Sequence, residues 1–262
     1  ANYYGLISIW FVCQIHSDIK LCFTIHGEGF FVRLESKKML RNIIVYVLKR
    51  TDIIIVGNEK LKKVLFCNHI TENIEVIDAF LTPGEDEGGE LPIYVEKLLS
   101  EEGKTIVANG YNIDFISENE DLYGYHILSD IAEKLNKDSV KFKMIILISD
   151  INEPEYISRL FDNVDNTYVL SDQSIVGWKF ISRADVMIRP TSTDANAFSL
   201  KEALLSNVFT IASDVVPRYE GVEIYEYGNN GELYLKVRKA ILNNIKPKLI
   251  VKDNIFSYEN IY

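Results

Sequence analysis

The chain has 262 residues, of which 47% are apolar and 25% are charged, proportions that are typical of a globular protein. Its net charge of −10 argues against a nucleic-acid-binding protein. The charge is uneven: residues 1–80 hold ten Lys or Arg and eight Asp or Glu (+2), whereas residues 81–262 hold eighteen and thirty (−12). We therefore expect the first part to approach an anionic surface more readily, which allows a peripheral membrane contact through an N-terminal domain.

The cysteines and the N-terminus bear on the compartment. Cys13, Cys22 and Cys67 are odd in number and form no C-x-x-C pair, and the first two lie in apolar segments. This pattern predicts buried free thiols in a reducing compartment. Neither a membrane-length apolar run nor a signal peptide is evident. The predicted location is the cytoplasm, either free or at the inner face of a membrane.

The first part of the chain alternates apolar helices and strands. Its periodicity predicts helices at 3–16, 37–49 and 58–66, and strands at 20–25, 52–56 and 74–77. We expect residues 1–83 to form a partial Rossmann-like domain, incomplete at its N-terminus, because so few strands cannot form a stable doubly covered sheet alone.

A Gly-, Pro- and acid-rich stretch at residues 84–91 predicts a linker. Glu85, Asp86 and Glu87 are interpreted as a solvated charge run rather than a metal site, since nothing fixes their geometry. No metal and no cofactor are predicted for the chain.

Residues 92–262 show the regular βα alternation of a second Rossmann-like domain with a parallel sheet. The predicted helices lie at 92–100, 120–135, 153–161, 174–182, 199–205 and 232–242. The predicted strands lie at 105–108, 142–148, 167–170, 184–188, 208–213 and 222–225.

The segment R-P-T-S-T-D-A-N-A-F-S-L-K-E-A, from Arg189 to Ala203, carries the chemistry. It lies between two predicted strands, at the carboxyl end of the first, where parallel sheets bind ligands. The backbone N–H groups of Phe198, Ser199 and Leu200 open a helix and suit a phosphate. The carboxylates of Asp194 and Glu202 could accept hydrogen bonds from the hydroxyls of a ribose.

A structural interpretation competes with this one. Ser199 followed three residues later by Glu202 has the pattern of a capping box. Asp194 in a loop rich in Thr and Asn suits an Asx-turn. On this window alone the structural interpretation is favoured.

The wider pattern resembles the retaining glycosyltransferases of the GT-B architecture, family 4, over essentially the whole chain. The strand A-D-V-M-I-R-P is followed by an acid-x7-acid pair, in which Asp194 and Glu202 take the two acid positions, and by the strand-containing stretch S-N-V-F-T-I-A-S-D. Ala195-Asn196-Ala197 stands where the family prefers Gly-Phe-Gly. The I-H-G at 25–27 resembles the family's first domain.

The resemblance implies roles for these residues. Glu202 would bind the ribose of a nucleotide-sugar, and Phe198 to Leu200 would hold the diphosphate. Asp194 and the following turn, with Ala197, would lie near the donor sugar. His26 would face it from the first domain and, with Asp194, act as a catalytic residue. A histidine that only caps the end of a strand is the alternative for His26.

The family usually places an Arg and a Lys after the first strand of the second domain, to bind the phosphates. Here the expected positions hold Asn112 and Tyr123. Arg189 is a candidate for the replacement charge, or it pairs with a surface acid.

These features predict a metal-independent retaining glycosyltransferase. It would move a sugar from a nucleoside-diphosphate sugar to a glycan or lipid-linked acceptor, in surface polysaccharide synthesis. The alternative is a non-catalytic, nucleotide-binding scaffolding protein, which the residues at 112 and 123 favour. A nucleotide-sugar epimerase is a third interpretation, for which the required cleft acids and histidine are not found.

Overall fold

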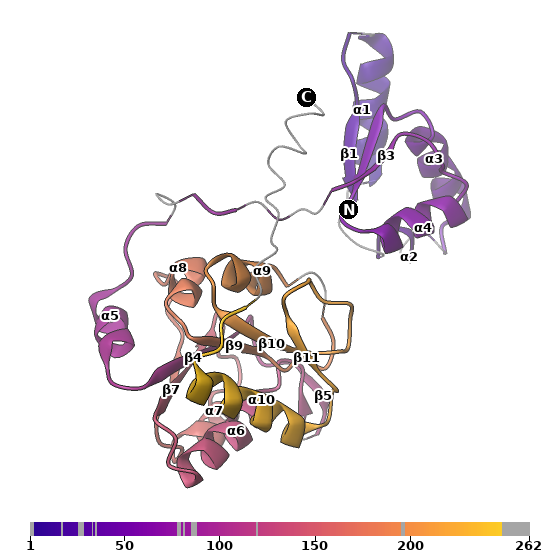
Figure 1. Cartoon of the computed structure of the whole chain (residues 1–262). Helices are drawn as coiled ribbons and strands as arrows, with labels where there is room; N and C mark the ends of the chain where they lie inside the picture. The colour runs from indigo at the N-terminus through magenta and orange to yellow at the C-terminus, as the bar shows by residue number, and fades with distance from the viewer. Residues whose placement is uncertain are drawn as a thin grey trace. The chain divides into compact units, whose positions relative to one another are not determined.

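The computed structural model describes residues 3–16, 18–25, 29–32, 34, 36–77, 80, 82–84, 88–118, 120–194 and 197–247. The chain divides into two compact units between Thr82 and Pro83. In Figure 1 the first unit is drawn in indigo to purple and the second in magenta to yellow.

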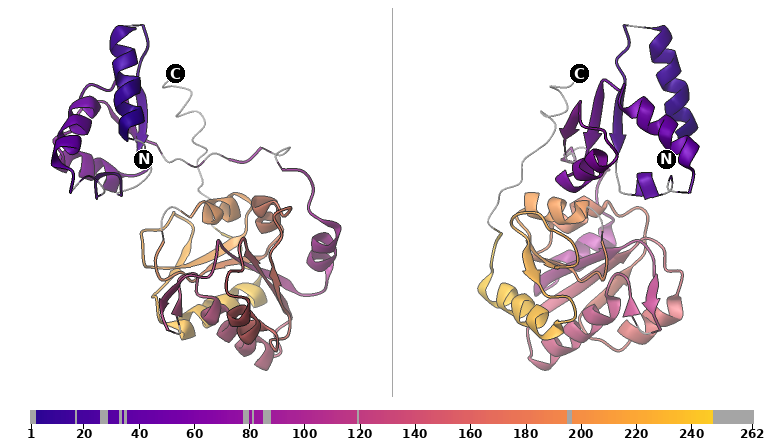
Figure 2. Two further views of the ribbon diagram at one scale, coloured as in Figure 1. Left: turned by 180° about the vertical axis from the view of Figure 1, so that it is seen from behind. Right: turned by 90° about the vertical axis from the view of Figure 1, so that its right-hand side faces the viewer.

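The first unit contains a three-stranded parallel sheet. Its strands, in sheet order, are β1 (Cys22–Ile25), β2 (Ile53–Val56) and β3 (Ile74–Val76). Four helices accompany them: α1 (Tyr3–Ile15), α2 (Gly29–Val32), α3 (Lys38–Leu48) and α4 (Glu59–Cys67), as Figure 2 shows from two sides. The β-branched run I-I-I-V of β2 suits a central strand and is almost fully buried. Ile44 and Val47 of α3 complete the same core.

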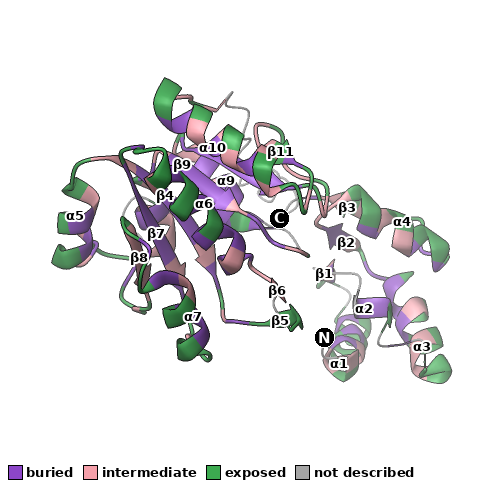
Figure 3. Cartoon of the chain, turned by 90° about the horizontal axis from the view of Figure 1, so that it is seen from below, coloured by how far each residue is buried: buried purple, intermediate pink, exposed green. Residues whose placement is uncertain are grey.

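The second unit is built on six parallel strands. In sheet order these are β11 (Glu223–Tyr225), β10 (Phe209–Ser213), β9 (Val186–Arg189), β4 (Lys104–Gly110), β7 (Phe142–Ile148) and β8 (Thr167–Leu170). A short antiparallel pair, β5 (Phe115–Ser117) and β6 (Glu120–Asp121), lies in the loop after β4. The central strands are buried along nearly their whole length (Figure 3), as expected for a sheet covered on both faces.

Two hydrophobic clusters cover the two faces of this sheet. One is formed with α6 (Tyr125–Lys137), α7 (Pro154–Phe161) and α10 (Asn230–Asn243). The other is formed with α5 (Ile93–Ser100), α8 (Gly177–Ser182) and α9 (Phe198–Leu205). The unit is therefore a doubly wound Rossmann-like domain, and the predicted α/β class with parallel sheets is confirmed.

The strand order reverses beside β4. From β4 the chain proceeds outward to β7 and β8, and then returns to the other side of β4 to form β9, β10 and β11. The loops after β4 and β9 thus diverge from neighbouring strand ends. In doubly wound sheets this reversal is where a ligand binds.

The predicted elements are present, with differences at their ends. The helix expected from residue 120 begins at Tyr125, because Asp121 accepts hydrogen bonds from the N–H groups of Tyr125 (2.9 Å) and His126 (3.2 Å). The helix expected from 174 begins at Gly177. The sequence pattern did not predict α2, β5 or β6, which are too short to show a periodicity.

The structure also bears on the expectations for the cysteines, for membrane-spanning helices and for the linker. None of the three cysteines forms a disulfide in the described part of the chain; Cys13 is buried as predicted, whereas Cys22 is only half-buried and Cys67 is exposed. In the part of the chain that the structure describes, no helix is long and apolar enough to cross a membrane. Glu85, Asp86 and Glu87 lie outside the described residues, but Gly88 already packs against Val176 of the second unit.

Two glycines shape the reversal point. A Cβ on Gly110, the last residue of β4, would lie 2.0 Å from the Tyr125 hydroxyl oxygen. Gly124 has φ +74°, and a Cβ there would lie 2.5 Å from the backbone oxygen of Pro190, the residue after β9. These glycines let the start of α6 pack directly against the ends of β4 and β9.

Replacing Gly124 by Ala should lower the free energy of unfolding by about 2–4 kcal/mol, because it adds left-handed backbone strain to a clash with backbone. Urea unfolding measures this loss. Gly177→Ala is the matched control, since a Cβ there meets nothing within 4 Å and its φ is not positive. Equal stability of the two variants would contradict the close packing at Pro190.

Candidate functional site

The candidate site lies at the carboxyl ends of β4 and β9. The loop after β9 is tied to the loop after β4 by the N–H of Ser192, which donates to the backbone oxygen of Leu122 at 3.0 Å. The predicted residues Asn112 and Tyr123 lie on the first loop, and Arg189 and Asp194 lie on the second. The structure therefore brings these four residues to one edge of the sheet. His26, Ala195 and Asn196 lie outside the described residues.

Asp194 is held between two arginines. Its carboxylate accepts from Nε and Nη2 of Arg189 at 2.7 and 2.8 Å, and from Nη1 of Arg218 at 2.6 Å. The three side chains are nearly buried, with 5%, 12% and 2% of their surfaces exposed for Asp194, Arg189 and Arg218. Burial alone would raise the pKa of Asp194, but the two guanidinium groups lower it below its ordinary value. Asp194 is therefore ionised and paired, and one positive charge is left over in the network.

Arg218 was not singled out from the sequence. It follows β10, and its Nε donates to the backbone oxygen of Ser213 at 2.8 Å, while its Nη2 lies 3.1 Å from the Ser213 hydroxyl oxygen. The Ser213 hydroxyl in turn donates to the backbone oxygen of Thr191 at 2.7 Å. Arg218 thus joins the ends of β9 and β10. A single arginine in a loop gives no sequence signal for this role, because the role depends on tertiary contacts.

Arg189 has hydrogen-bonding capacity left. Its Nε and Nη2 bind Asp194, and its Nη1 has no acceptor among the residues that the structure describes. The guanidinium carbon lies 6.0 Å from the centroid of the Tyr123 ring. Arg189 pairs with a buried acid rather than with a surface acid, and it faces the loop on which cations were expected.

The expected cation positions are occupied by packed polar side chains. The Asn112 amide donates to Asp114 at 3.1 Å, and its backbone oxygen accepts from the Tyr125 hydroxyl at 3.1 Å. The side-chain oxygen of Asn112 is buried and has no hydrogen-bond partner. Neither Asn112 nor Tyr123 carries a charge, and Arg189 on the neighbouring strand brings a positive charge to within 6.0 Å of the Tyr123 ring centroid.

The start of α9 has no side-chain cap among the residues that the structure describes. Its N-cap residue is Ala197. The competing capping-box interpretation is therefore wrong: Ser199 is already inside the helix and Glu202 lies in its second turn. Of the three N–H groups predicted to bind phosphate, that of Leu200 donates to the backbone oxygen of Ala197 at 3.0 Å. The N–H of Ser199 has no acceptor among the described residues.

The start of α6, the helix that follows β4, is capped by a side chain. Both oxygens of the fully buried Asp121 cap the first N–H groups of α6, and the carboxylate also binds the His126 ring at 2.8 Å and the Tyr156 hydroxyl at 2.9 Å. Burial opposes ionisation of Asp121, but these hydrogen bonds lower its pKa. The start of α6 is satisfied by the protein itself, whereas the start of α9 can receive an anion.

Glu202 is half-buried on α9. Burial raises the pKa of its carboxyl above the ordinary value of 4.5. Within the described residues, no hydrogen bond or ion pair reaches this carboxylate. A desolvated acid that no described residue pairs with lowers the stability of the fold, and such groups are candidates for functional sites.

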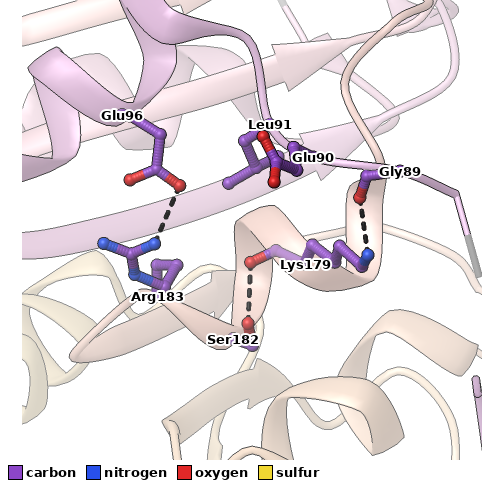
Figure 4. A pocket seen from close by; sticks show the side chains of 7 residues that line it. All are labelled: Gly89, Glu90, Leu91, Glu96, Lys179, Ser182 and Arg183. Carbon is purple, nitrogen blue, oxygen red and sulfur yellow. Dashed lines mark hydrogen bonds and ion pairs between the residues drawn. The ribbon is translucent and has the colours of Figure 1, made fainter. Parts of the chain in front are cut away.

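Two hollows of the second unit lie away from the candidate site. One, of about 480 Å³, is lined by residues 89–91 and by side chains of α5 and α8, including the Glu96–Arg183 ion pair at 2.8 Å (Figure 4). The other, of about 560 Å³, is lined by Lys236 and Lys239 of α10 and by the first residues of β10 and β11. Neither hollow contains a predicted site residue. Among the described residues, no group of three or more His, Cys, Asp or Glu is placed to hold a metal ion.

Comparisons with known proteins identify the fold. No family model matches the chain, and no curated protein sequence is similar to it. Among solved structures, a glycosyltransferase from Rickettsia africae is 13% identical with a TM-score of 0.60, covering 99% of this chain and 81% of that one. The trehalose-6-phosphate synthase OtsA is 13% identical with a TM-score of 0.59, covering 84% and 59%.

The structure of TarM is also similar, at 14% identity and a TM-score of 0.56, covering 87% of this chain and 45% of that chain. A point mutant of TarM from S. aureus has been solved with UDP. The chain therefore spans about half of the length of TarM and 59% of that of OtsA. At this level of identity the likeness is one of fold: the chain has the GT-B-like, two-unit Rossmann fold of these glycosyltransferases.

Replacing Asp194 by Asn should cost about 3–5 kcal/mol of unfolding free energy, because two nearly buried guanidinium groups lose their counter-charge. Because the pKa of Asp194 is lowered in the folded state, its contribution is present above about pH 3.9 and is lost as the pH falls through the folded value. Urea unfolding at several pH values should show the difference between wild type and variant shrinking in acid.

Glu102→Gln serves as the control, since Glu102 and Lys141 form an ion pair that is exposed on both sides. That variant should unfold like the wild type. An Asp194→Asn variant as stable as the control would show that the two arginines do not depend on Asp194.

Proposed function

We propose that the chain binds a nucleoside-diphosphate sugar at the start of α9 and transfers the sugar to an acceptor. The proposal rests on a helix start without a side-chain cap and on the Glu202 carboxylate, which has no hydrogen-bond or ion-pair partner among the described residues. Both lie at the reversal of the strand order, where a Rossmann-like sheet binds nucleotides.

Each part of the donor has a partner in this arrangement. The N–H groups at Phe198 and Ser199, together with the positive end of the α9 dipole, would hold the diphosphate. The free Nη1 of Arg189 would add a full charge on the side of Tyr123. The Glu202 carboxylate would accept hydrogen bonds from the ribose hydroxyls.

Asp194 has a different role from the one that the resemblance implies. Its oxygens already accept from two arginines, and Thr191 lies within 3.4 Å. We infer that Asp194 positions the loop from 190 to 197, which carries the turn beside the donor sugar. The catalytic role that the family resemblance implies for His26 remains part of the proposal.

The chemistry requires stabilisation of the departing diphosphate. As the bond between the sugar and the diphosphate breaks, negative charge builds on the phosphate oxygens, and fixed donors lower the barrier most where charge develops. Arg189 and the start of α9 would supply this stabilisation without a metal ion. The family resemblance adds retention of configuration at the anomeric carbon.

The ligands of similar solved structures suggest the base of the donor. TarM has been solved with UDP, and an E. coli trehalose-6-phosphate structure holds UDP-2-fluoro glucose. We therefore expect the base of the donor to be uracil. A glycan or a lipid-linked acceptor in surface polysaccharide synthesis, reached from the cytoplasmic side, completes the proposed activity.

A thermal-shift panel of UDP, GDP, ADP and their sugars tests the donor site. At tenfold above its Kd, a ligand should add about 1.4 kcal/mol of stability, a shift of a few degrees. Glu202→Gln should weaken the nucleotide that responds by about 10–100-fold, because a charged acceptor for the ribose is lost. Glu133→Gln, an exposed acid on α6, is the matched control.

Unchanged nucleotide affinity in Glu202→Gln would remove the proposed donor site. Binding that depends on Glu202 without any sugar transfer to an acceptor would instead establish the non-catalytic, nucleotide-binding alternative. The two measurements together separate the site from the reaction.

The affinity for a nucleotide-sugar should depend on pH through Glu202. The ionised form accepts from the ribose, and burial raises its pKa above 4.5, so the affinity should fall as the pH decreases through this raised value. Titration calorimetry between pH 4 and pH 8 measures this step. Glu202→Gln should lack the step, and a step of equal size in both proteins would assign it to another group.

A further inference from the structure

A tyrosine at the edge of the second unit reaches across the carboxyl ends of the sheet. Tyr227 lies two residues after the end of β11, which is the edge strand. Its hydroxyl donates a hydrogen bond to the carboxylate of Glu120, on β6 in the loop after β4. The strands β10 and β9 lie between β11 and β4, so the contact joins loops whose strands are about 14 Å apart at the usual strand spacing.

Tyr227 also contacts the loops of the two strands between. Its N–H donates to Oδ1 of Asp214, which follows β10, at 2.9 Å. A hydrogen bond joins its hydroxyl to the side chain of Ser192, in the loop after β9. One residue therefore contacts the loops after β4, β9 and β10. We name Tyr227, Glu120, Ser192 and Asp214 the Tyr227 strap.

The Glu120 end of the strap is held firmly. The next residue, Asp121, is fully buried. Its carboxylate accepts hydrogen bonds from the N–H groups of Tyr125 (2.9 Å) and His126 (3.2 Å) and from the hydroxyl of Tyr156 (2.9 Å). The backbone beside Glu120 is thereby fixed, and the Glu120 carboxylate can serve as the anchor of the strap.

The chemistry of Tyr227 suits a permanent hydrogen bond. Burial and then the hydrogen bond to Glu120 raise the pKa of the Tyr227 hydroxyl well above its ordinary value of 10. The hydroxyl therefore keeps its proton at neutral pH and remains a donor. Hydrogen bonds from a hydroxyl to a carboxylate are stronger than those between neutral groups. The ring of Tyr227 also packs against the core that α6, α7 and α10 form with the sheet.

The loops that Tyr227 contacts are those that carry the ion pairs of the candidate site. Ser192 lies two residues before Asp194, and Asp214 lies four residues before Arg218. The side chains of Asp194 and Arg218 are only 5% and 2% exposed. The strap thus holds both sides of a nearly buried charge network.

The strap also bears on Arg189. Ser192 donates its N–H to the backbone oxygen of Leu122 at 3.0 Å, and Leu122 lies two residues after Glu120. The following residue is Tyr123, whose ring centroid lies 6.0 Å from the guanidinium carbon of Arg189. A looser contact between these two loops would let Arg189 and Tyr123 move relative to each other.

We propose that Tyr227 is a positioning residue of the donor site, which acts through Glu120 and Ser192 to keep the Arg189 guanidinium in place for a phosphate. Tyr227 itself touches no part of the donor in this arrangement. The inference rests on the proposed function, because the orientation of Arg189 affects a ligand only if a diphosphate binds there.

Titration calorimetry with UDP tests the proposal. Tyr227→Phe removes the hydroxyl and keeps the ring, and it should weaken UDP about three- to tenfold, a usual size for a residue that acts through its neighbours. Glu120→Met should have the same effect, and the double variant should be no weaker than either, because one hydrogen bond is lost in all three. Glu120→Gln keeps an acceptor for the hydroxyl and should retain most of the affinity.

Tyr234→Phe is the matched control. The Tyr234 hydroxyl donates to the carboxylate of Asp138, which follows the far end of α6, so this variant loses a similar bond away from the site. It should bind UDP like the wild type. Hydrogen exchange in the absence of nucleotide should be faster at Ser192 in Tyr227→Phe and Glu120→Met, but not in Tyr234→Phe.

The outcomes separate this inference from the proposed function. A wild-type chain that does not bind UDP would reject the donor site, and with it this role of Tyr227. A wild-type chain that binds UDP, with equal affinity in Tyr227→Phe, would overturn the role of Tyr227 alone. Faster exchange at Ser192 without a change in UDP affinity would show a purely structural residue and would also overturn it, as would Glu120→Gln binding as weakly as Glu120→Met.

Discussion

The ion pairs between Asp194 and two arginines are the constraint on which the candidate site depends. Arg189 is the last residue of β9, and Arg218 follows β10, so the single carboxylate joins two strand ends and the loop between them. Nearly buried charges need a partner of opposite sign, and each member of this network would be unfavourable alone. The network therefore fixes the path of the chain that leads into α9.

The helices α6 and α9 follow the two strands at the reversal of the strand order, and they differ in how their first N–H groups are capped. The start of α6 is closed by Asp121, whose oxygens take the donors that an incoming anion would need. Among the described residues no side chain caps the start of α9, whose N-cap residue is Ala197, and the partly buried Glu202 carboxylate has no hydrogen-bond or ion-pair partner. The positive charge left over by Asp194 lies at Arg189, whose guanidinium carbon is 6.0 Å from the centroid of the Tyr123 ring. The proposed diphosphate site at α9 rests on these three features.

Much of this arrangement was predictable from the sequence. Apolar periodicity located the long helices and strands, and the order of elements around Arg189 to Asn207 indicated a parallel sheet with its ligand site at the carboxyl ends. Local patterns were less reliable. The spacing of Ser199 and Glu202 suggested a capping box as the competing interpretation, but α9 begins at Phe198, so the serine lies too far inside the helix to cap it.

What the sequence could not supply are contacts between residues far apart in the chain. Arg218 lies 24 positions after Asp194, and nothing in its own neighbourhood indicates that it binds this carboxylate. The close approach of Gly124, just before α6, to the backbone of Pro190 is another such contact. The contact of Tyr227 with Glu120 is likewise a tertiary result, because the two residues lie 107 positions apart in the chain.

The central claim is that α9 and Glu202 form a nucleotide site, and a crystal structure of the chain grown with UDP would test it most directly. We expect the diphosphate at the first turn of α9, the ribose hydroxyls within hydrogen-bond distance of Glu202, and Nη1 of Arg189 directed at a phosphate oxygen. UDP bound instead in the hollow beside Lys236 and Lys239, with the start of α9 unoccupied, would contradict the account.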